Sequence, residues 1–173
     1  GCLNDDDTPV TIQFDGHNAV FTYDAGSLQC RLIEGRYPNY NSVIQQGNPY
    51  LVAVDRKTLH GALKRVMPFA NESSQLVRLD ISDGRMTIKS EDIEFATKAV
   101  ETLPCNFVGA RVSIGFKGAG LLGVLSSLTF DEVTLHIGDP SRPCLIIPSE
   151  QPETQNILML LMLSSSGISN AVV

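Results

Sequence analysis

Histidine, cysteine and carboxylate side chains are the residues of this sequence that could support acid–base, nucleophilic or metal-assisted catalysis. The three histidines, His17, His60 and His136, fall in a predicted turn, on a predicted helix face and in a predicted strand. No serine, cysteine or carboxylate spacing joins them into a catalytic set. The acidic pair Asp92/Glu94 lies on one predicted solvated strand face. The sequence therefore predicts no catalytic residue and a protein that is not an enzyme.

Metal, redox and phosphate-loop motifs are also missing from the sequence. The four cysteines are widely separated, without a C-x-x-C pair: Cys2, Cys30, Cys105 and Cys144. This spacing predicts small buried thiols in a reducing, cytoplasmic protein. A glycine cluster precedes a predicted helix, but no G-K-[ST] follows it, so we expect packing residues there: Gly115, Gly118, Gly120 and Gly123. No metal and no cofactor are expected.

One concentrated basic patch stands out in an otherwise acidic chain. Asp55 is a plausible N-cap, and the apolar residues that follow it recur at helical spacing up to Pro68. The opposite face of this predicted helix carries the basic residues Arg56, Lys57, His60, Lys64 and Arg65. Such a face is either an ordinary solvated surface or a surface that contacts DNA phosphates without reading bases.

The totals fit a globular protein of one domain, or of one domain and part of another. Of 173 residues, 43% are hydrophobic and 18% charged, and the net charge is −6. An acidic total does not suggest nucleic-acid binding through a general basic surface. The first ten residues lack a signal-peptide pattern, and the longest apolar run, residues 157–163, is too short for a membrane span. We expect no membrane association.

The predicted elements begin with three strands that have no helix to cover them. Apolar residues alternate through residues 10–14, 19–23 and 28–32, with a turn at Asp15. Three such strands cannot bury their own apolar face, so the chain is expected to begin inside a larger domain. A segment rich in turn-forming residues, 32–44, then connects them to a second region.

The second region contains an internal repeat of strand, helix and three strands. The third strand of the first copy is predicted to pass through Ile93 and Phe95 towards Val100. The matched apolar positions are Leu59/Leu121, Leu63/Leu125, Val66/Leu128, Val77/Val133, Leu79/Leu135 and Ile81/Ile137. Two such copies predict one α+β domain with antiparallel sheet and both helices on one side.

Four stretches of the sequence resemble the bacterial β sliding clamp of DNA polymerase III. They are LIEGRYPNY before the first helix, the IGFKG-to-LSSL segment, DPSRPCLIIPSE, and the closing LMLLM. The first resembles the [VL]-x-G-[RK]-[FY]-P-[DN]-Y segment that joins the middle and C-terminal domains of that family, with Ile33 at the Val/Leu position. The resemblance runs from about Thr8 to Leu163.

The resemblance implies the DNA clamp (processivity) fold and a division of the chain. Residues 1–40 would be the last strands of an incomplete middle domain, and 41–163 the C-terminal domain. The tail, residues 164–173, is small and polar at first and has no periodicity, so it is expected to be poorly ordered. Two three-domain subunits of the family close head-to-tail into a ring around duplex DNA and tether the polymerase. The full-length parent is thus expected to be a homodimeric ring, whereas this chain, without a first domain, is not.

The resemblance also implies where DNA and the second subunit would lie. Helices at 56–69 and 117–128 would face the channel, and the candidate phosphate neighbours are Arg56, Lys57, Lys64, Arg65 and Lys117. Candidate residues at the subunit interface are Pro68, Phe69 and Glu94.

A hydrophobic pocket between the middle and C-terminal domains is a further implication. In the family it receives short hydrophobic peptides of polymerases, the clamp loader and repair proteins. Matching positions here are Pro38, Ser42, Val43, Lys117, Gly120, Leu160, Leu161 and Met162. The sequence departs from the family at Val43-Ile44-Gln45 and Met162-Leu163-Ser164. The alternative function is an isolated peptide-binding module that does not encircle DNA.

Overall fold

The computed structural model describes residues 7–35, 39, 44, 47–138 and 143–150, together with the backbone of 159–161. The chain divides into two compact units, unit 1 at Gly1–Asn39 and unit 2 at Tyr40–Val173. Among the described residues, no helix has both the length and the apolar character needed to cross a membrane.

Unit 1 is a three-stranded antiparallel sheet formed by β1 (Thr11–Phe14), β2 (Asn18–Tyr23) and β3 (Gly26–Arg31). The β1–β2 turn is fixed by Asp15, whose carboxylate accepts hydrogen bonds of 2.7 Å from two backbone amides. Those bonds, from His17 and then Asn18, hold the pKa of Asp15 below its ordinary value. Among the residues described in this unit, only Ala19 is buried, so the sheet has no core of its own.

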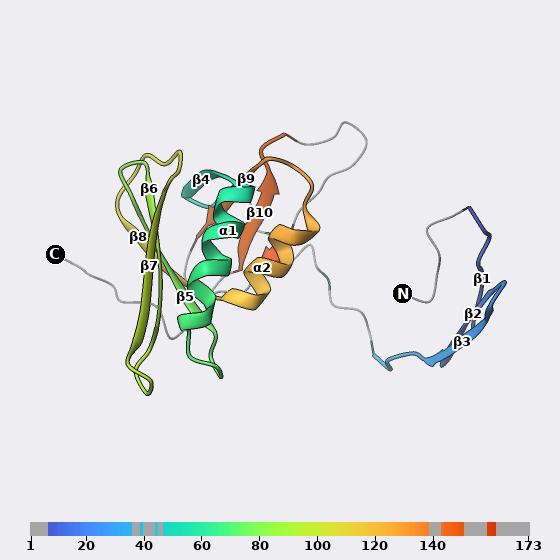
Figure 1. Cartoon of the computed structure of the whole chain (residues 1–173). Helices are drawn as coiled ribbons and strands as arrows, with labels where there is room; N and C mark the ends of the chain where they lie inside the picture. The colour runs from blue at the N-terminus through green and yellow to red at the C-terminus, as the bar shows by residue number, and fades with distance from the viewer. Residues whose placement is uncertain are drawn as a thin grey trace. The chain divides into compact units, whose positions relative to one another are not determined.

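Unit 2 consists of two copies of strand, helix and three strands, as the sequence predicts (Figure 1). The first copy is β4 (Tyr50–Asp55), α1 (Arg56–Val66) with the short 3-10 helix η2 (Met67–Phe69), β5 (Leu76–Ser82), β6 (Arg85–Asp92) and β7 (Thr97–Pro104). The second copy is β8 (Val112–Lys117), α2 (Gly118–Ser127), β9 (Glu132–Ile137), β10 (Cys144–Pro148) and β11 (Met159–Leu161).

The two copies exchange their first strands. One antiparallel sheet has the order β7-β6-β5-β8, and the other has the order β11-β10-β9-β4. β8 therefore completes the sheet of the first copy, where Leu79 pairs with Ile114, and β4 completes that of the second, where Val52 pairs with Leu135. Because each ladder joins both halves, unit 2 cannot lose one copy without breaking the sheet of the other.

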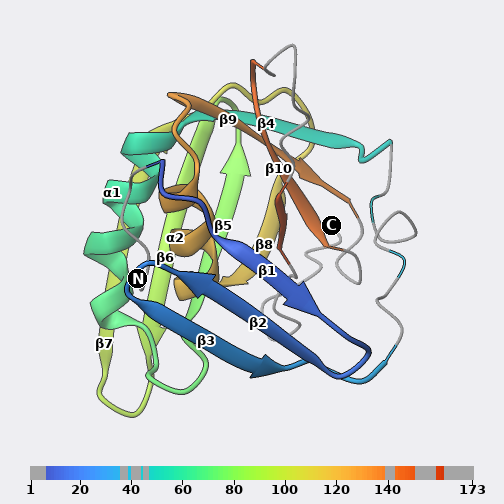
Figure 2. The ribbon, with the colours of Figure 1, turned by 90° about the vertical axis from the view of Figure 1, so that its right-hand side faces the viewer.

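Both helices pack on the same side of the two sheets, which gives unit 2 a single core (Figures 1 and 2). Strand residues alternate between this core and the outside, so that Val77, Leu79 and Ile81 are fully buried on β5. The helices contribute the stripes that the helical spacing predicts: Leu59, Ala62, Leu63 and Val66 from α1, and Leu121 and Leu125 from α2. The predicted α+β fold with a two-fold internal repeat is confirmed.

The start of the third strand is where the sequence prediction is wrong. Ile93 and Phe95 belong to the turn between β6 and β7, and their exposed fractions are 87% and 74%. Asp92 creates this turn, because its carboxylate accepts hydrogen bonds from the backbone amides of Glu94 (2.9 Å) and Phe95 (3.2 Å). Ala96 closes the turn with a φ of 50°, and β7 begins at Thr97. Alternating apolar residues indicate a strand only when a core is present to bury them.

Candidate nucleic-acid interface and partner surfaces

Helix α1 positions the basic face, and its N-terminus is held by Asp55. The Asp55 carboxylate accepts a 2.7 Å hydrogen bond from the backbone amide of Thr58. Hydrogen bonds from the side chain and backbone of Thr58 lower the pKa of Asp55, so the cap remains ionised at neutral pH. With the apolar stripe buried, the basic residues predicted for the opposite face turn away from the core.

Arg56 has a structural partner rather than a free guanidinium. Its Nε donates to the backbone oxygen of Phe130 at 2.5 Å, and its Nη1 donates to the backbone oxygen of Leu125 at 3.0 Å. The Arg56 amide also donates to the backbone oxygen of Asp131 at 2.7 Å. These bonds place a positive charge at the C-terminal end of α2, where the helix dipole favours it. Arg56 thus links the start of α1 to the end of α2.

Two other basic residues of the face have acidic partners. Lys57 Nζ lies 2.8 Å from a carboxylate oxygen of Asp131, and both side chains are largely exposed. The Arg65 guanidinium donates two hydrogen bonds to the carboxylate of Glu101 on β7, and the one from Nε is 3.0 Å long. This hydrogen bonding lowers the pKa of Glu101, so the pair stays charged at neutral pH.

Lys64 is the basic residue of α1 that forms no hydrogen bond or ion pair with another described residue. Its neighbour His60 contacts the second helix, with Nε2 3.1 Å from the hydroxyl oxygen of Ser126. Burial, and then the charges of Lys64 and Arg56, lower the pKa of His60. His60 is therefore neutral at pH 7, and the positive charge of this face comes from lysine and arginine alone.

Lys117 is separated from the α1 residues by strand geometry. It is the exposed last residue of β8, pairs with Leu76 on β5, and follows the fully buried Phe116. Alternation along the strand places Lys117 and Phe116 on opposite faces of the sheet, and the helices cover the face of Phe116. The structure therefore does not bring Lys117 together with the basic residues of α1.

The three predicted interface residues lie in two segments at one end of unit 2. Pro68 and Phe69 lie in η2, and Glu94 lies in the β6–β7 turn. Between these segments is a hollow of about 510 Å³, lined in part by Met67, Pro68, Asn71, Asp92 and Phe95. Phe69 is 41% exposed, and the turn adds the exposed side chains of Ile93 and Phe95, whose place on this surface the sequence reading missed.

Half of the eight predicted pocket residues lie outside the described part of the chain. This holds for Pro38, Ser42, Val43 and Met162, while Leu160 and Leu161 are described only as backbone that pairs with β10. Gly120 lies half-buried on α2, and α2 packs beside β11. The structure thus brings the helix of Gly120 next to the strand that carries Leu160 and Leu161.

Metal binding and nucleophilic catalysis by cysteine find little support in the part of the chain that the structure describes. No group of three or more His, Cys, Asp or Glu residues there could hold a metal ion. Burial raises the pKa of Cys144 to about 12, despite an opposing hydrogen bond at His136, and raises the pKa of Cys105 as well. Neither thiol is a ready nucleophile at neutral pH.

Comparison with known proteins gives one consistent result. A family model described as the C-terminal domain of the DNA polymerase III beta subunit matches residues 41–162. The beta sliding clamp of Caulobacter vibrioides is 28% identical over 152 residues, which cover 88% of this chain and 41% of that protein. The beta sliding clamp of Pseudomonas putida is 27% identical over 161 residues, which cover 93% of this chain and 44% of that protein.

Solved structures agree with the sequence comparisons. The DNA polymerase III subunit beta from Pseudomonas aeruginosa has a TM-score of 0.80 at 25% identity, over 94% of this chain and 43% of that one. A sliding clamp from the same organism bound to griselimycin has a TM-score of 0.75 at 25% identity, over 90% of this chain and 41% of that one. The chain therefore spans about two fifths of the length of the relatives that it matches.

Proposed function

The chain belongs to the family defined by the C-terminal domain of the DNA polymerase III beta subunit, and from this premise we propose that it supplies one domain of a sliding clamp ring. Such a ring encircles duplex DNA and tethers the replicative polymerase, without catalysing a reaction itself. The observation that carries the proposal is the interlocked repeat of unit 2, with both helices on one side, in a chain whose relatives are named sliding clamps. The complete protein would be a homodimer.

In this proposal the two units belong to different domains of a sliding clamp. Unit 1 corresponds to the last strands of a middle domain, residues 1–40, and unit 2 to the C-terminal domain, residues 41–163. The exposed apolar side chains of unit 1 support this assignment: Ile12 is 56% exposed, Phe14 79% and Leu28 49%. Further strands or helices of the same domain would cover them.

The helices would face DNA, with Lys64 as the main free contact to phosphate. A ring that slides needs cations near the duplex but few strong, fixed contacts, because each phosphate that is neutralised adds affinity. The partners of Lys57 and Arg65, together with the net charge of −6, fit weak and sequence-independent contact. Arg56 is held by backbone oxygens and would act by positioning the two helices.

The surface around η2 and the β6–β7 turn would meet the second subunit. Pro68, Phe69 and Glu94 lie there together with Ile93 and Phe95, so the surface combines exposed apolar side chains with a charged residue. Apolar groups at the centre and charged groups at the rim are typical of stable protein interfaces.

Short hydrophobic peptides would bind where α2 and β11 meet, with Met162 and Leu160 among the lining residues. The structure of a relative bound to griselimycin supports a ligand site on this family of proteins. The test is titration of a labelled Gln-Leu-x-Leu-Phe peptide with the full chain and its Met162→Ala variant. We expect saturable binding that Met162→Ala weakens about tenfold, because burying one large apolar side chain contributes about 1.5–3 kcal/mol.

The matched control for this titration is Val108→Ala, which shortens an apolar side chain that is 95% exposed in the loop between β7 and β8. It should leave the affinity unchanged. Equal affinities for the wild type and Met162→Ala would contradict the proposed pocket. Encirclement of DNA needs a different test, namely retention on closed circular DNA and release when the circle is cut.

A further inference from the structure

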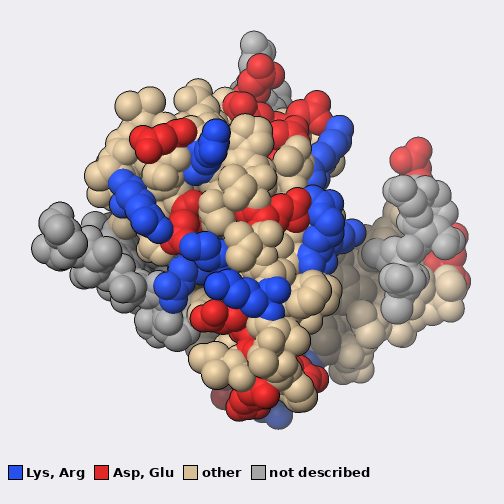
Figure 3. Space-filling model, turned by 60° about the vertical axis from the view of Figure 1, so that its left-hand side comes forward, with Lys and Arg blue, Asp and Glu red and all other residues tan. Residues whose placement is uncertain are grey.

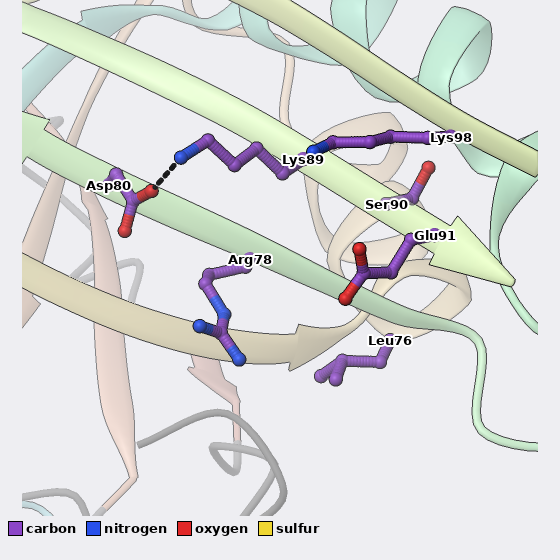
Figure 4. A pocket seen from close by; sticks show the side chains of 7 residues that line it. All are labelled: Leu76, Arg78, Asp80, Lys89, Ser90, Glu91 and Lys98. Atoms are coloured by element: carbon purple, nitrogen blue, oxygen red, sulfur yellow. Dashed lines mark hydrogen bonds and ion pairs between the residues drawn. The ribbon is translucent and has the colours of Figure 1, made fainter. Parts of the chain in front are cut away.

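A shallow groove crosses the outward face of the sheet β7-β6-β5-β8, which is the face that the helices do not cover. Its volume is about 200 Å³, and it is lined by Leu76, Arg78, Asp80, Lys89, Ser90, Glu91 and Lys98 (Figure 4). Figure 3 brings this side of unit 2 forward and shows Lys and Arg side chains gathered across it, with Asp and Glu between them. The residues come from three neighbouring strands, so the fold determines their spacing.

Within the groove, one lysine and one carboxylate form an ion pair with each other. Lys89 Nζ lies 2.6 Å from a carboxylate oxygen of Asp80, and Arg111 approaches the same oxygen at 3.9 Å. Burial raises the pKa of Asp80, but hydrogen bonds from Lys89 and Ser113 and the charges of Lys89 and Arg111 lower it further than burial raises it. Asp80 is thus ionised and satisfied at neutral pH.

Arg78 and Lys98 remain available. Neither forms a hydrogen bond or ion pair with another residue that the structure describes. They extend from β5 and β7 on either side of β6 and are offset by two residues along the strands, because Arg78 pairs with Lys89 whereas Lys98 pairs with Glu91 (Figure 4). Their backbones are therefore roughly 12 Å apart. Glu91 of β6 lies between the two, directly across from Lys98, so the two long side chains can hold a partner's carboxylate only beside that acidic group (Figure 4).

We infer that this groove binds an acidic segment of a partner protein, with Arg78 and Lys98 holding a carboxylate and Leu76 contacting an apolar neighbour. Three cationic and two acidic side chains line the groove, which leaves a local positive excess in a chain with a net charge of −6. The volume is too small for a folded ligand but suits one or two side chains. The presence of Leu76 beside the cations favours a peptide over a purely ionic ligand.

This inference does not depend on the proposed function. The groove lies on the side of the sheet that faces away from α1 and α2, so DNA at the helices and a peptide in the groove would not compete for the same residues. Failure of DNA encirclement would leave the groove proposal intact, and failure of the groove would leave encirclement intact.

The experiment measures fluorescence anisotropy of fluorescein-labelled hexaglutamate titrated with the full chain. The groove variant is Arg78→Gln/Lys98→Gln, and the matched control is Lys57→Gln/Lys64→Gln, which removes the same charge from α1. We expect saturable binding by the wild type, about tenfold weaker binding by the groove variant, and less than about a twofold change in the control. All four side chains are at least partly exposed, so the variants should fold.

Two competitors distinguish the sources of the anion. Inorganic phosphate should displace hexaglutamate only at far higher concentration, and a thymidine oligonucleotide of equal charge should compete less well than unlabelled hexaglutamate. Equal losses in the two double variants would overturn the proposal, because net charge alone would then explain binding. So would the absence of saturable binding, or equal competition by phosphate or by the oligonucleotide.

Discussion

Arg56 shows how a single side chain can look like a DNA contact and yet serve the fold. Its two donors bond to backbone oxygens at the end of α2 and in the segment that follows it. In the sequence it is one of several basic residues on a helix face. The partners Leu125 and Phe130 lie in the second repeat, so no local pattern could reveal the contact.

We predict that Arg56→Gln lowers the free energy of unfolding by about 1–3 kcal/mol, because partly buried carbonyl groups lose a charged donor. Lys57→Gln is the control, since it removes the same charge at the next position but breaks only an exposed ion pair. Its effect should stay within about 0.5 kcal/mol. Urea unfolding followed by circular dichroism measures both values, and equal effects would show that Arg56 is an ordinary surface cation.

Lys64 should show the opposite behaviour. We expect Lys64→Gln to leave stability unchanged, to weaken binding of duplex DNA, and to reduce the slope of log affinity against log salt by about one. Arg85→Gln removes the same charge from the exposed start of β6 and should affect DNA binding much less. A salt slope that changes equally in both variants would place DNA elsewhere than on α1.

At the scale of elements, the two copies of the repeat begin their helices differently. Asp55 caps α1 through its carboxylate, whereas Lys117, at the same position before α2, forms no side-chain cap. The sequence could predict the cap from Asp55 and the helix from its apolar stripe. It could not predict the exchange of β4 and β8, because apolar periodicity is local whereas strand pairing joins distant segments. The sequence prediction placed Ile93 and Phe95 in a strand for a related reason, because alternation does not reveal whether a core is present to bury the apolar side chains.

The cap gives a prediction that depends on pH. At pH 7, Asp55→Ala should lower the free energy of unfolding by about 0.5–2 kcal/mol, and Lys117→Ala by less than about 0.5 kcal/mol. Hydrogen bonds from Thr58 lower the pKa of Asp55 in the folded state, so its stabilisation is fully present above the unfolded pKa of about 3.9. It is lost as pH falls through the folded pKa.

The stability difference between wild type and Asp55→Ala should therefore narrow in acid, while the difference for Lys117→Ala stays constant. Urea unfolding of the three proteins at pH 7 and at several values below pH 4 measures this. A difference for Asp55→Ala that widens in acid would show that the carboxylate does not cap α1 in its ionised form.

At the scale of the whole molecule, the protein combines one unit with a complete core and one without. Unit 2 buries an apolar stripe from each helix against both sheets, while the sheet of unit 1 leaves Phe14 and Leu28 exposed. The sequence already indicates this difference, since three strands precede any helix. The family also follows from sequence, because the Gly35–Tyr40 motif and the repeat are both visible in it. The resemblance already named Pro68, Phe69 and Glu94 as candidates for the subunit surface, but the exposed Ile93 and Phe95 beside them required the fold, since η2 and the β6–β7 turn meet only in three dimensions.

The most direct test of the sliding clamp proposal is topological. The complete product of the gene that encodes this chain is loaded on nicked circular DNA by the clamp loader of its host and passed over a sizing column at high salt. We predict that it stays with circular DNA and is lost once a restriction enzyme linearises the circle, because a closed ring is held by topology rather than by phosphate contacts. Phe69→Asp, which places a charge in the proposed subunit surface, should abolish retention on the circle. Equal retention on circular and linear DNA, or none on either, would contradict the account.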